Sequence, residues 1–215
     1  FDRMMKRINR HLTQRSEMLS GISHDLRTPL TRLKLQLAMM DKKETVQKMA
    51  EDIDEMEKML SNYLQYAKSQ TEEKSIKINI NKLISNVLKK YDPSKYNFVS
   101  SDMLEIRGRE NLIKRCILNV IENGLAYGNK IFIEIKKSIN GAIITVEDNG
   151  PGIPKNEYSN VFRPFYRIDK SRGLNKSGVG LGLSVAQDII KSHGGNISLS
   201  ESRYKGLLVK ISFPF

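Results

Sequence analysis

Cysteine and long apolar runs are scarce or missing in this chain of 215 residues, and each of these two shortages excludes a class of protein. A single cysteine, Cys116, rules out an internal disulfide framework and fits a reducing compartment. Its neighbours in the sequence are apolar, so we expect a buried structural thiol and not a nucleophile. No run approaches the ~20 apolar residues that a membrane span requires, and no signal peptide is visible.

Positive charge, in contrast, is abundant. The formal net charge of +12 raises the question of nucleic-acid binding. However, the basic residues are spread along the whole chain among acidic ones, and neither zinc-finger spacing nor an aromatic-basic RNA motif is present. A solvated surface explains this charge better, and we expect no nucleic-acid partner. A helical nucleic-acid-binding module remains an alternative, which salt-dependent binding to arbitrary duplex DNA would support.

The first third of the chain, up to about residue 68, has a helical pattern with two apolar series. The series are Leu19, Ile22, Leu26, Leu30, Leu33, Leu37 and Met40, and then Met49, Ile53, Met56, Leu60, Tyr63 and Ala67. Both are heptad seams separated by a polar break, which predicts an antiparallel helical hairpin. Two helices alone would leave part of this apolar face wet, so we expect a second copy to complete a dimeric four-helix bundle.

His24 stands apart from this apolar pattern. The heptad places it at position f, furthest from the predicted core. A solvated imidazole is partly neutral and nucleophilic near pH 7. Asp25 is adjacent, Thr28 lies one helical turn further on, and Pro29 would bend the helix. Taken alone, an exposed histidine is more often inert, so this pattern leaves both a functional and a bland interpretation open.

Beyond a polar linker at residues 69–75, the period of the apolar pattern changes. Alternation predicts strands near 76–80, 131–135, 143–146, 197–199 and 207–213, and helical spacing predicts helices near 82–91, 109–127 and 179–193. A hairpin turn is expected at Asn140-Gly141. The second part is therefore predicted to be an α/β sandwich with one mixed sheet and helices on one face.

Three stretches of this second part favour nucleotide chemistry. Asn119 and Asn123 lie four residues apart on one helical face, where their amide oxygens suit Mg²⁺. Asp148, in EDNGPGI, would offer a carboxylate to an adenine amino group, and its glycines allow close approach to a flat ring. SGVGLGLS, residues 177–184, would present backbone N–H groups to phosphates at a helix N-terminus. Each stretch alone is weak, since helical asparagine pairs, turns and glycine strings are common.

The ordered set of motifs resembles the cytoplasmic core of a sensor histidine kinase. The matching boxes are SHDLRTPL (phosphoacceptor), ENGLAYG (N box), DNGPG (G1), FRPF (F box) and GVGLGL (G2). In detail, SHDLRTPLTRL is similar to the EnvZ-like osmosensor kinases. The resemblance implies a dimerisation and histidine-phosphotransfer domain followed by a Bergerat-type ATP-binding domain, as shared with gyrase, Hsp90 and MutL.

This resemblance also implies how the chain is divided and what it does. The expected parts are the end of a signalling linker (1–15), the phosphotransfer domain (16–68), a linker (69–75) and the ATP-binding domain (76–215). The implied activity is autophosphorylation by ATP with Mg²⁺ and phosphotransfer to an aspartate of an OmpR-like response regulator. The expected setting is a homodimer that forms the soluble, cytoplasmic portion of a longer bacterial inner-membrane protein.

The resemblance assigns roles to single residues as well. His24 would be phosphorylated on a ring nitrogen with Asp25 as general base, and Thr28 would position water when the kinase acts as a phosphatase on its partner. The residues implied in ATP binding are Asn119, Asn123, Tyr127, Asp148, Gly150, Gly152, Phe165, Arg167, Ser177, Gly178, Val179, Gly180, Leu181 and Gly182, with Asn123 and Asn119 as the Mg²⁺ ligands.

Three positions depart from the family pattern. Ala126 stands where a basic residue usually meets the phosphates, Val179 replaces the usual threonine, and Gly124 replaces an alanine. Candidates to supply the missing charge are Asn129, Lys130 and Arg167.

A gyrase- or Hsp90-class ATP-binding module without phosphotransfer is the alternative, as is a degenerate kinase that acts only as a phosphatase. The gyrase and Hsp90 relatives carry a catalytic glutamate where this helix has Asn119, and they have no need of His24. Glu122 is nearby, but it lies on a different helical face from Asn119.

Overall fold

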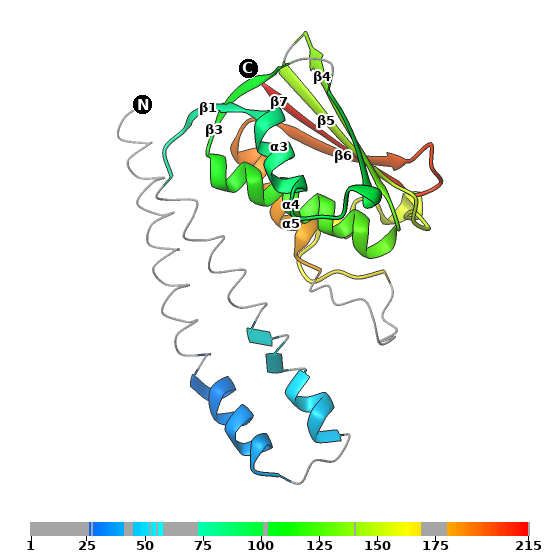
Figure 1. The fold of residues 1–215 in the computed structure, drawn as a ribbon. Coiled ribbons are helices and arrows are strands. Elements are labelled where there is room, and N and C mark those ends of the chain that lie inside the picture. Colours follow the sequence, from blue (N-terminus) through cyan, green and yellow to red (C-terminus); the bar gives the residue numbers. More distant parts are fainter. Residues whose placement is uncertain are drawn as a thin grey trace. The chain divides into compact units, whose positions relative to one another are not determined.

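The structure of this chain is a computed structural model that divides into two compact units, Phe1–Glu73 and Lys74–Phe215 (Figure 1). The residues that it describes are 26, 28–40, 45–51, 53–54, 56–57, 73–100, 103–139, 141–168 and 180–214. Within this described part, no helix combines the length and the apolar character that a membrane crossing requires.

The first unit contains the predicted helical hairpin in its described part. Residues 28–38 and 45–51 are helical, and the helical pattern continues at 53–54 and 56–57. Leu30 and Leu37 from the first helix are buried with Ile53 from the second, and Val46 and Ala50 pack against them. The hairpin is therefore confirmed, and apolar packing between the two helices stabilises it.

A charged cluster also joins the two helices. The Lys34 ammonium lies 2.6 Å from a carboxylate oxygen of Glu57 and also pairs with Asp54. Because the three side chains are 29 to 53% exposed, water screens these pairs, and they contribute little to stability compared with the apolar cluster.

Five of the eight residues of the predicted apolar seam that the structure describes are not covered within a single chain. Residues of the seam that remain 47 to 58% exposed are Leu26, Leu33, Met40, Met49 and Met56. Some of them line an apolar hollow of about 370 Å³ together with Leu37 and Ile53. The hairpin thus buries one side of its apolar face and exposes the other.

The second unit is built on a five-stranded mixed sheet with strand order β2-β4-β5-β7-β6. The strands are β2 (Tyr96–Ser100), β4 (Ile131–Ser138), β5 (Gly141–Asp148), β6 (Asn196–Glu201) and β7 (Leu207–Pro214). β2 pairs with β4 in parallel, whereas the other pairs are antiparallel. The predicted hairpin is confirmed, because β4 and β5 pair from Ser138–Gly141 to Ile131–Asp148.

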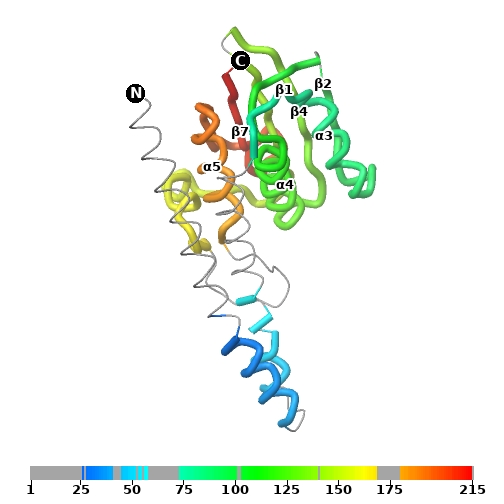
Figure 2. The backbone as a smooth tube through the Cα atoms, turned by 90° about the vertical axis from the view of Figure 1, so that its left-hand side faces the viewer, coloured from blue at the N-terminus to red at the C-terminus, as the bar shows by residue number. Residues whose placement is uncertain are grey.

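In the described part of this unit, three helices cover one face of the sheet (Figures 1 and 2). They are α3 (Ile80–Leu88), α4 (Glu110–Tyr127) and α5 (Gly182–Ser192). Alternate residues of the central strands, such as Ile133 and Ile144, are buried against the helices, as the two-residue period of a strand requires. The predicted α/β sandwich is therefore confirmed, and so is the predicted helix near 109–127.

Two expectations about the start of this unit are wrong. β1 (Ile76–Asn79) pairs with β3 (Glu105–Gly108) in a separate two-stranded sheet and not in the main one. Ile80, expected to continue the strand, is the first residue of α3 and is fully buried. Its neighbour Asn79 explains the change, because its side chain accepts a hydrogen bond from Lys82 N at 2.9 Å and so caps the helix.

Candidate functional site

Asp148 ends β5 directly opposite Ile131 and is only 5% exposed. Its Oδ1 accepts hydrogen bonds from Gly150 N at 2.8 Å and from Leu207 N at 3.2 Å. Burial raises the pKa of this carboxyl, and the two backbone donors act in the opposite direction. Among the described residues, both hydrogen bonds are to Oδ1, which leaves Oδ2 for a ligand.

The helix α4 carries Asn119 and Asn123 past this carboxylate, and both residues are half-buried. A β-carbon added at Gly124 would lie 3.6 Å from Asp148 Cβ, so α4 packs closely on the end of β5. A β-carbon added at Gly182 would lie 3.9 Å from Asn119 Cβ, so the first turn of α5 meets the same helix. The structure therefore brings together the N-box helix, the G1 carboxylate and the start of α5.

The glycines of the G1 segment have packing roles of their own. A β-carbon at Gly150 would lie 2.8 Å from the carbonyl oxygen of Tyr127, at the C-terminal end of α4. Gly152 has a φ of +71°, a conformation that favours glycine. A β-carbon there would lie 3.2 Å from the carbonyl oxygen of Gly206. These close approaches hold the segment between α4 and the β6–β7 loop, residues 202–206.

Asn149, which sequence analysis did not single out, closes the turn between α4 and β4. Its Oδ1 accepts hydrogen bonds from Asn129 N at 2.8 Å and from Lys130 N at 2.9 Å. The asparagine of the DNGPG motif thus fixes the backbone next to Asp148, and its only sequence signal is its place in that motif.

The F-box segment is tied to the start of α5 through the backbone. Phe165 has a φ of +64°, its side chain is 59% exposed, and its N donates a hydrogen bond to the carbonyl oxygen of Gly180 at 3.0 Å. Tyr166 donates its hydroxyl proton to Glu157 Oε2 at 2.6 Å. This bond raises the pKa of Tyr166 and lowers the pKa of Glu157. The segment is therefore anchored at two neighbouring points.

The remaining predicted site residues occupy different parts of the chain. His24, Asp25 and the stretch Ser177, Gly178 and Val179 lie outside the described residues. Tyr127 and Arg167 are exposed, Gly180 and Leu181 immediately precede α5, and Thr28 is exposed on the first helix of the hairpin.

The candidates for the missing charge at Ala126 differ in their surroundings. The ammonium of Lys130 lies 5.9 Å from the ring centre of Phe132. Strand alternation places Phe132 on the sheet face away from the helices, because its neighbours Ile131 and Ile133 are buried beneath them. The exposed Arg167 side chain is next to the F box instead, on the segment that leads to α5.

The described residues contain no group of three or more histidine, cysteine or acidic side chains that would hold a metal ion. The oxygens that α4 offers are the amides of Asn119 and Asn123, a small set that suits Mg²⁺ only together with phosphate oxygens. Cys116 is fully buried, and burial raises the pKa of its thiol, which confirms the predicted structural role.

Two family descriptions match this chain. Residues 108–215, half of the chain, match "Histidine kinase-, DNA gyrase B-, and HSP90-like ATPase". Residues 14–72 match "His Kinase A (phospho-acceptor) domain". The first match includes Asn119, Asp148 and Gly182, and the second includes His24 and Thr28.

Known proteins with this combination resemble the chain over its whole length. Sensor histidine kinase GtrS of Pseudomonas aeruginosa is 32% identical over 216 residues, which cover 100% of this chain and 45% of GtrS. Sensor histidine kinase CpxA of Escherichia coli is 30% identical over 228 residues, which cover 100% of this chain and 50% of CpxA. The chain thus spans about half the length of these relatives.

The fold has counterparts among solved structures. Full-length ShkA in complex with AMPPNP matches 93% of this chain and 46% of ShkA with a TM-score of 0.70 at 20% identity. AdeS of Acinetobacter baumannii, a histidine kinase, matches 89% of this chain and 97% of that structure with a TM-score of 0.63 at 22% identity. At this level of identity the likeness shows the fold.

Proposed function

Because this chain belongs to the family of histidine kinase-, DNA gyrase B- and HSP90-like ATPases and carries a His Kinase A phosphoacceptor domain before it, we propose that it is an ATP-dependent protein histidine kinase. It phosphorylates its own His24 and passes the phosphate to an aspartate of a response regulator. Membership of the ATPase family implies ATP binding, and the phosphoacceptor domain sets this chain apart from a gyrase- or Hsp90-class module without phosphotransfer.

The observation that carries this proposal is the environment of Asp148. One carboxylate oxygen is held by two backbone donors, and the other is left for the amino group of adenine. Asn119 and Asn123 lie on the helix packed against it, and the start of α5, which would carry the phosphates, meets Asn119. These groups support a nucleotide that runs from the end of β5 to the N-terminus of α5.

The amide oxygens of Asn119 and Asn123 fit the hard-donor preference of Mg²⁺, and Asn123 is the principal ligand in this proposal. When bound, Mg²⁺ neutralises negative charge on the phosphates. The chain itself contributes the backbone N–H groups of Gly180, Leu181 and Gly182 near the phosphates and the Asp148 carboxylate at the base. Tyr127 belongs to the N box, Phe165 ends the F box and Arg167 follows it, and all three are assigned to nucleotide binding in this proposal.

The transfer itself joins a ring nitrogen of His24 to the γ-phosphorus of ATP. The N–P bond forms as the bond between that phosphorus and the oxygen bridging it to ADP breaks, and ADP leaves. The proton on the ring passes to Asp25 as general base. The domain parts in this proposal are 16–68 for phosphotransfer and 76–215 for ATP binding, with 1–15 and 69–75 as linkers.

A second copy of the chain completes the phosphotransfer domain in this proposal. Leu33, Met40 and Met49 are about half exposed although they belong to the heptad seam. Burying their apolar surface against an identical hairpin gives a four-helix bundle. Sedimentation should therefore show a dimer of the full chain, and substitution of Leu33 and Met40 with glutamate should produce monomers.

Thr28 supports a further phosphatase activity. It lies exposed on the first helix of the hairpin, four residues after His24 in the sequence, where its hydroxyl would hold water in line with a docked aspartyl phosphate. Positioning of one water typically changes rates by about 100-fold or more. Thr28→Ala should keep autophosphorylation and lose most of the decay of a phosphorylated regulator in the presence of ADP. Decay at the parent rate would contradict the phosphatase role.

The box SHDLRTPLTRL supports grouping with EnvZ-like osmosensor kinases, and hence an OmpR-like regulator as the acceptor. Osmosensing and attachment to an inner membrane remain predictions that rest on this resemblance.

The decisive experiment incubates the chain with γ-labelled ATP and Mg²⁺ and tests whether the label is lost in acid, as phosphohistidine requires. His24→Gln should abolish labelling and leave ATP binding intact. Residual label on His11 or His193 would contradict the assignment. For His193 the structure opposes acceptance, because Arg109 N donates to its Nε2 at 3.0 Å and its Nδ1 lies 2.7 Å from the carbonyl oxygen of Ile189.

A further inference from the structure

Glu147 is a buried acidic residue on the face of the sheet that the helices leave open. It precedes Asp148 in β5, and strand alternation therefore points the two carboxylates to opposite faces. Only 5% of Glu147 is exposed. A carboxylate buried to this degree needs partners, since an unpaired buried charge is strongly destabilising.

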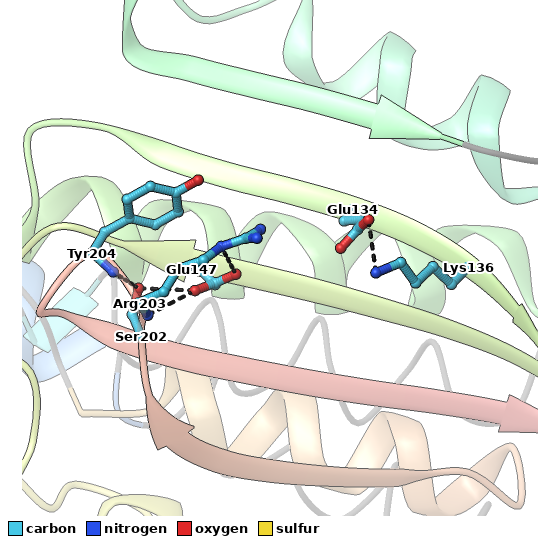
Figure 3. Close-up of polar contacts among 6 residues, drawn as sticks. All are labelled: Glu134, Lys136, Glu147, Ser202, Arg203 and Tyr204. Atoms are coloured by element: carbon cyan, nitrogen blue, oxygen red, sulfur yellow. Dashed lines mark hydrogen bonds and ion pairs between the residues drawn. The ribbon is translucent and has the colours of Figure 1, made fainter.

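Among the residues that the structure describes, the partners of Glu147 come from one loop. Ser202 Oγ and Arg203 N each donate to Glu147 Oε2 at 3.1 Å, and Arg203 Nε pairs with Oε1 at 3.1 Å (Figure 3). Both donors belong to the β6–β7 loop, residues 202–206. The carboxylate thus binds a side-chain hydroxyl, a backbone N–H and a guanidinium at the end of β5.

The same loop also holds Asp148 on the other side of the strand. Leu207, the first residue of β7 and the neighbour of Gly206, donates its N–H to Asp148 Oδ1. Gly206 lies so close that an added β-carbon would come 2.6 Å from the carbonyl carbon of Asp148. The β6–β7 loop and the residue that follows it therefore contact two carboxylates at the end of β5, one on each face of the sheet.

Packing and backbone geometry indicate that this arrangement is held firmly. The Tyr204 ring stacks on Phe132 with ring centres 3.6 Å apart and an interplanar angle of 13°. Lys205 has a φ of +73°, which is unusual for a residue other than glycine and persists only where the surroundings enforce it. Ser202 N donates to the carbonyl oxygen of Gly206 at 3.0 Å and closes the loop on itself.

From this geometry we infer that Glu147 is a positioning residue for nucleotide selection. By holding the β6–β7 loop, it keeps Leu207 N on one oxygen of Asp148 and so aims the other oxygen at the amino group of adenine. The inference rests on the proposed role of Asp148 in adenine recognition. Its consequence is that Glu147, on the opposite face of the sheet from the nucleotide, determines the preference for adenine over guanine.

Glu134 provides a matched control on the same open face. It forms an ion pair with Lys136 Nζ at 2.9 Å, within its own strand, and its side chain is 28% exposed compared with 6% for Glu147 (Figure 3). Because this pair does not involve the β6–β7 loop, Glu134→Gln removes a similar charge without loosening Asp148.

The test compares dissociation constants for ADP and GDP, which carry the two bases but lack the γ-phosphate that the kinase transfers. In the full chain, Glu147→Gln keeps the shape of the side chain but replaces an acceptor oxygen with a donor. We expect its preference for ADP over GDP to fall by about tenfold, within the range for loss of a charged hydrogen bond. Glu134→Gln should change the preference by less than about twofold.

A stability measurement separates positioning from support of the fold. A lower melting temperature for Glu147→Gln with an unchanged ADP:GDP ratio would show a purely structural role and overturn the inference. If Glu147→Gln does not fold, Arg203→Met removes the guanidinium from a side chain that is 62% exposed. We expect this variant to fold and to lose about threefold in preference, and no loss would overturn the inference.

Asp148→Ala separates this inference from the proposed function. If Asp148→Ala keeps its preference for ADP, the proposed adenine contact itself is wrong. If Asp148→Ala loses the preference but Glu147→Gln retains it, only the role of Glu147 fails. If both hold, adding Glu147→Gln to Asp148→Ala should cause no further loss, because the two residues act on the same contact.

Discussion

Substitution of Asp148 by asparagine and by alanine should separate its two roles. Asparagine keeps a carbonyl oxygen that can accept from Gly150 N and Leu207 N, the donors that now share Oδ1. Its amide nitrogen, however, would face the adenine amino group as a second donor. Alanine removes both acceptors. We therefore expect asparagine to lose adenine recognition alone, and alanine to lose adenine recognition and stability together.

The sizes of these effects follow from burial. Leu207 is only 3% exposed, so its N–H would lose its acceptor out of reach of water, whereas Gly150 is half-buried. A buried donor without a partner costs about 1–3 kcal/mol, and we assign this loss to alanine chiefly through Leu207. Loss of a hydrogen bond to a carboxylate should weaken ADP by about 10–100-fold in both variants.

Stability should rise or stay level in Asp148→Asn at neutral pH. Burial raises the pKa of Asp148, which means that the folded state disfavours its charge. As the pH rises through that raised pKa, Asp148 becomes charged and the folded state loses stability. Asparagine carries no charge and avoids this loss. Thermal melts and ADP titrations of the three proteins at neutral pH test both expectations.

Acid titration gives an independent check. Below its raised pKa Asp148 binds a proton and no longer accepts from adenine as a carboxylate. As the pH is lowered, the ADP:GDP preference of the parent should therefore fall at a pH above the range in which an ordinary aspartate takes up a proton. The preference of Asp148→Asn should not change at that pH. Equal destabilisation by asparagine and alanine would refute the hydrogen-bonding argument, and tight ADP binding by Asp148→Asn would refute the adenine contact.

Three further substitutions test the packing around the site and in the hairpin. Gly124→Ala gains about 1 kcal/mol of helix propensity, but its β-carbon would lie 2.9 Å from Ile131 Cγ2. Overpacking costs about 1–3 kcal/mol, so the melting temperature should fall, and a rise would contradict this. Tyr166→Phe removes the hydrogen bond that lowers the pKa of Glu157. The variant should be fully destabilised at neutral pH, and the difference from the parent should vanish as the pH falls through that lowered pKa. A difference in melting temperature that does not depend on pH would contradict this expectation. Leu37→Ala should cost about 2–5 kcal/mol of hairpin stability in circular-dichroism melts and leave ADP affinity unchanged, because it lies in the apolar cluster of the other unit.

Elements with a strong local period were predictable from the sequence. The helix expected near 109–127 is α4, Glu110–Tyr127, because one of its faces is apolar at helical spacing. The strands β4 and β5 and their turn were also predictable, since alternation and a turn signal occur within a few residues of one another.

One strand of the main sheet, β2, escaped prediction. β2 (Tyr96–Ser100) lies at the edge of the sheet and is largely exposed, so it lacks a clear alternation. Its partner is β4, and the whole of α4 lies between the two strands in the sequence. Ile80 continues the apolar alternation of β1 in the sequence, but it is the first residue of α3, which Asn79 caps. In both cases a tertiary or capping contact outweighed the local pattern.

The candidate site divides in the same way. The sequence by itself determined which chemical groups are available, since the amides of Asn119 and Asn123 and the carboxylate of Asp148 occur in ordered motifs. It could not show why Glu147 is buried, because an acidic residue in a strand is usually solvated. Only the pairing of β5 with β7, which sets Glu147 opposite Leu208, brings the β6–β7 loop to both carboxylates. Local periodicity is a property of neighbouring residues, whereas a partner 55 positions away is decided when the sheet assembles.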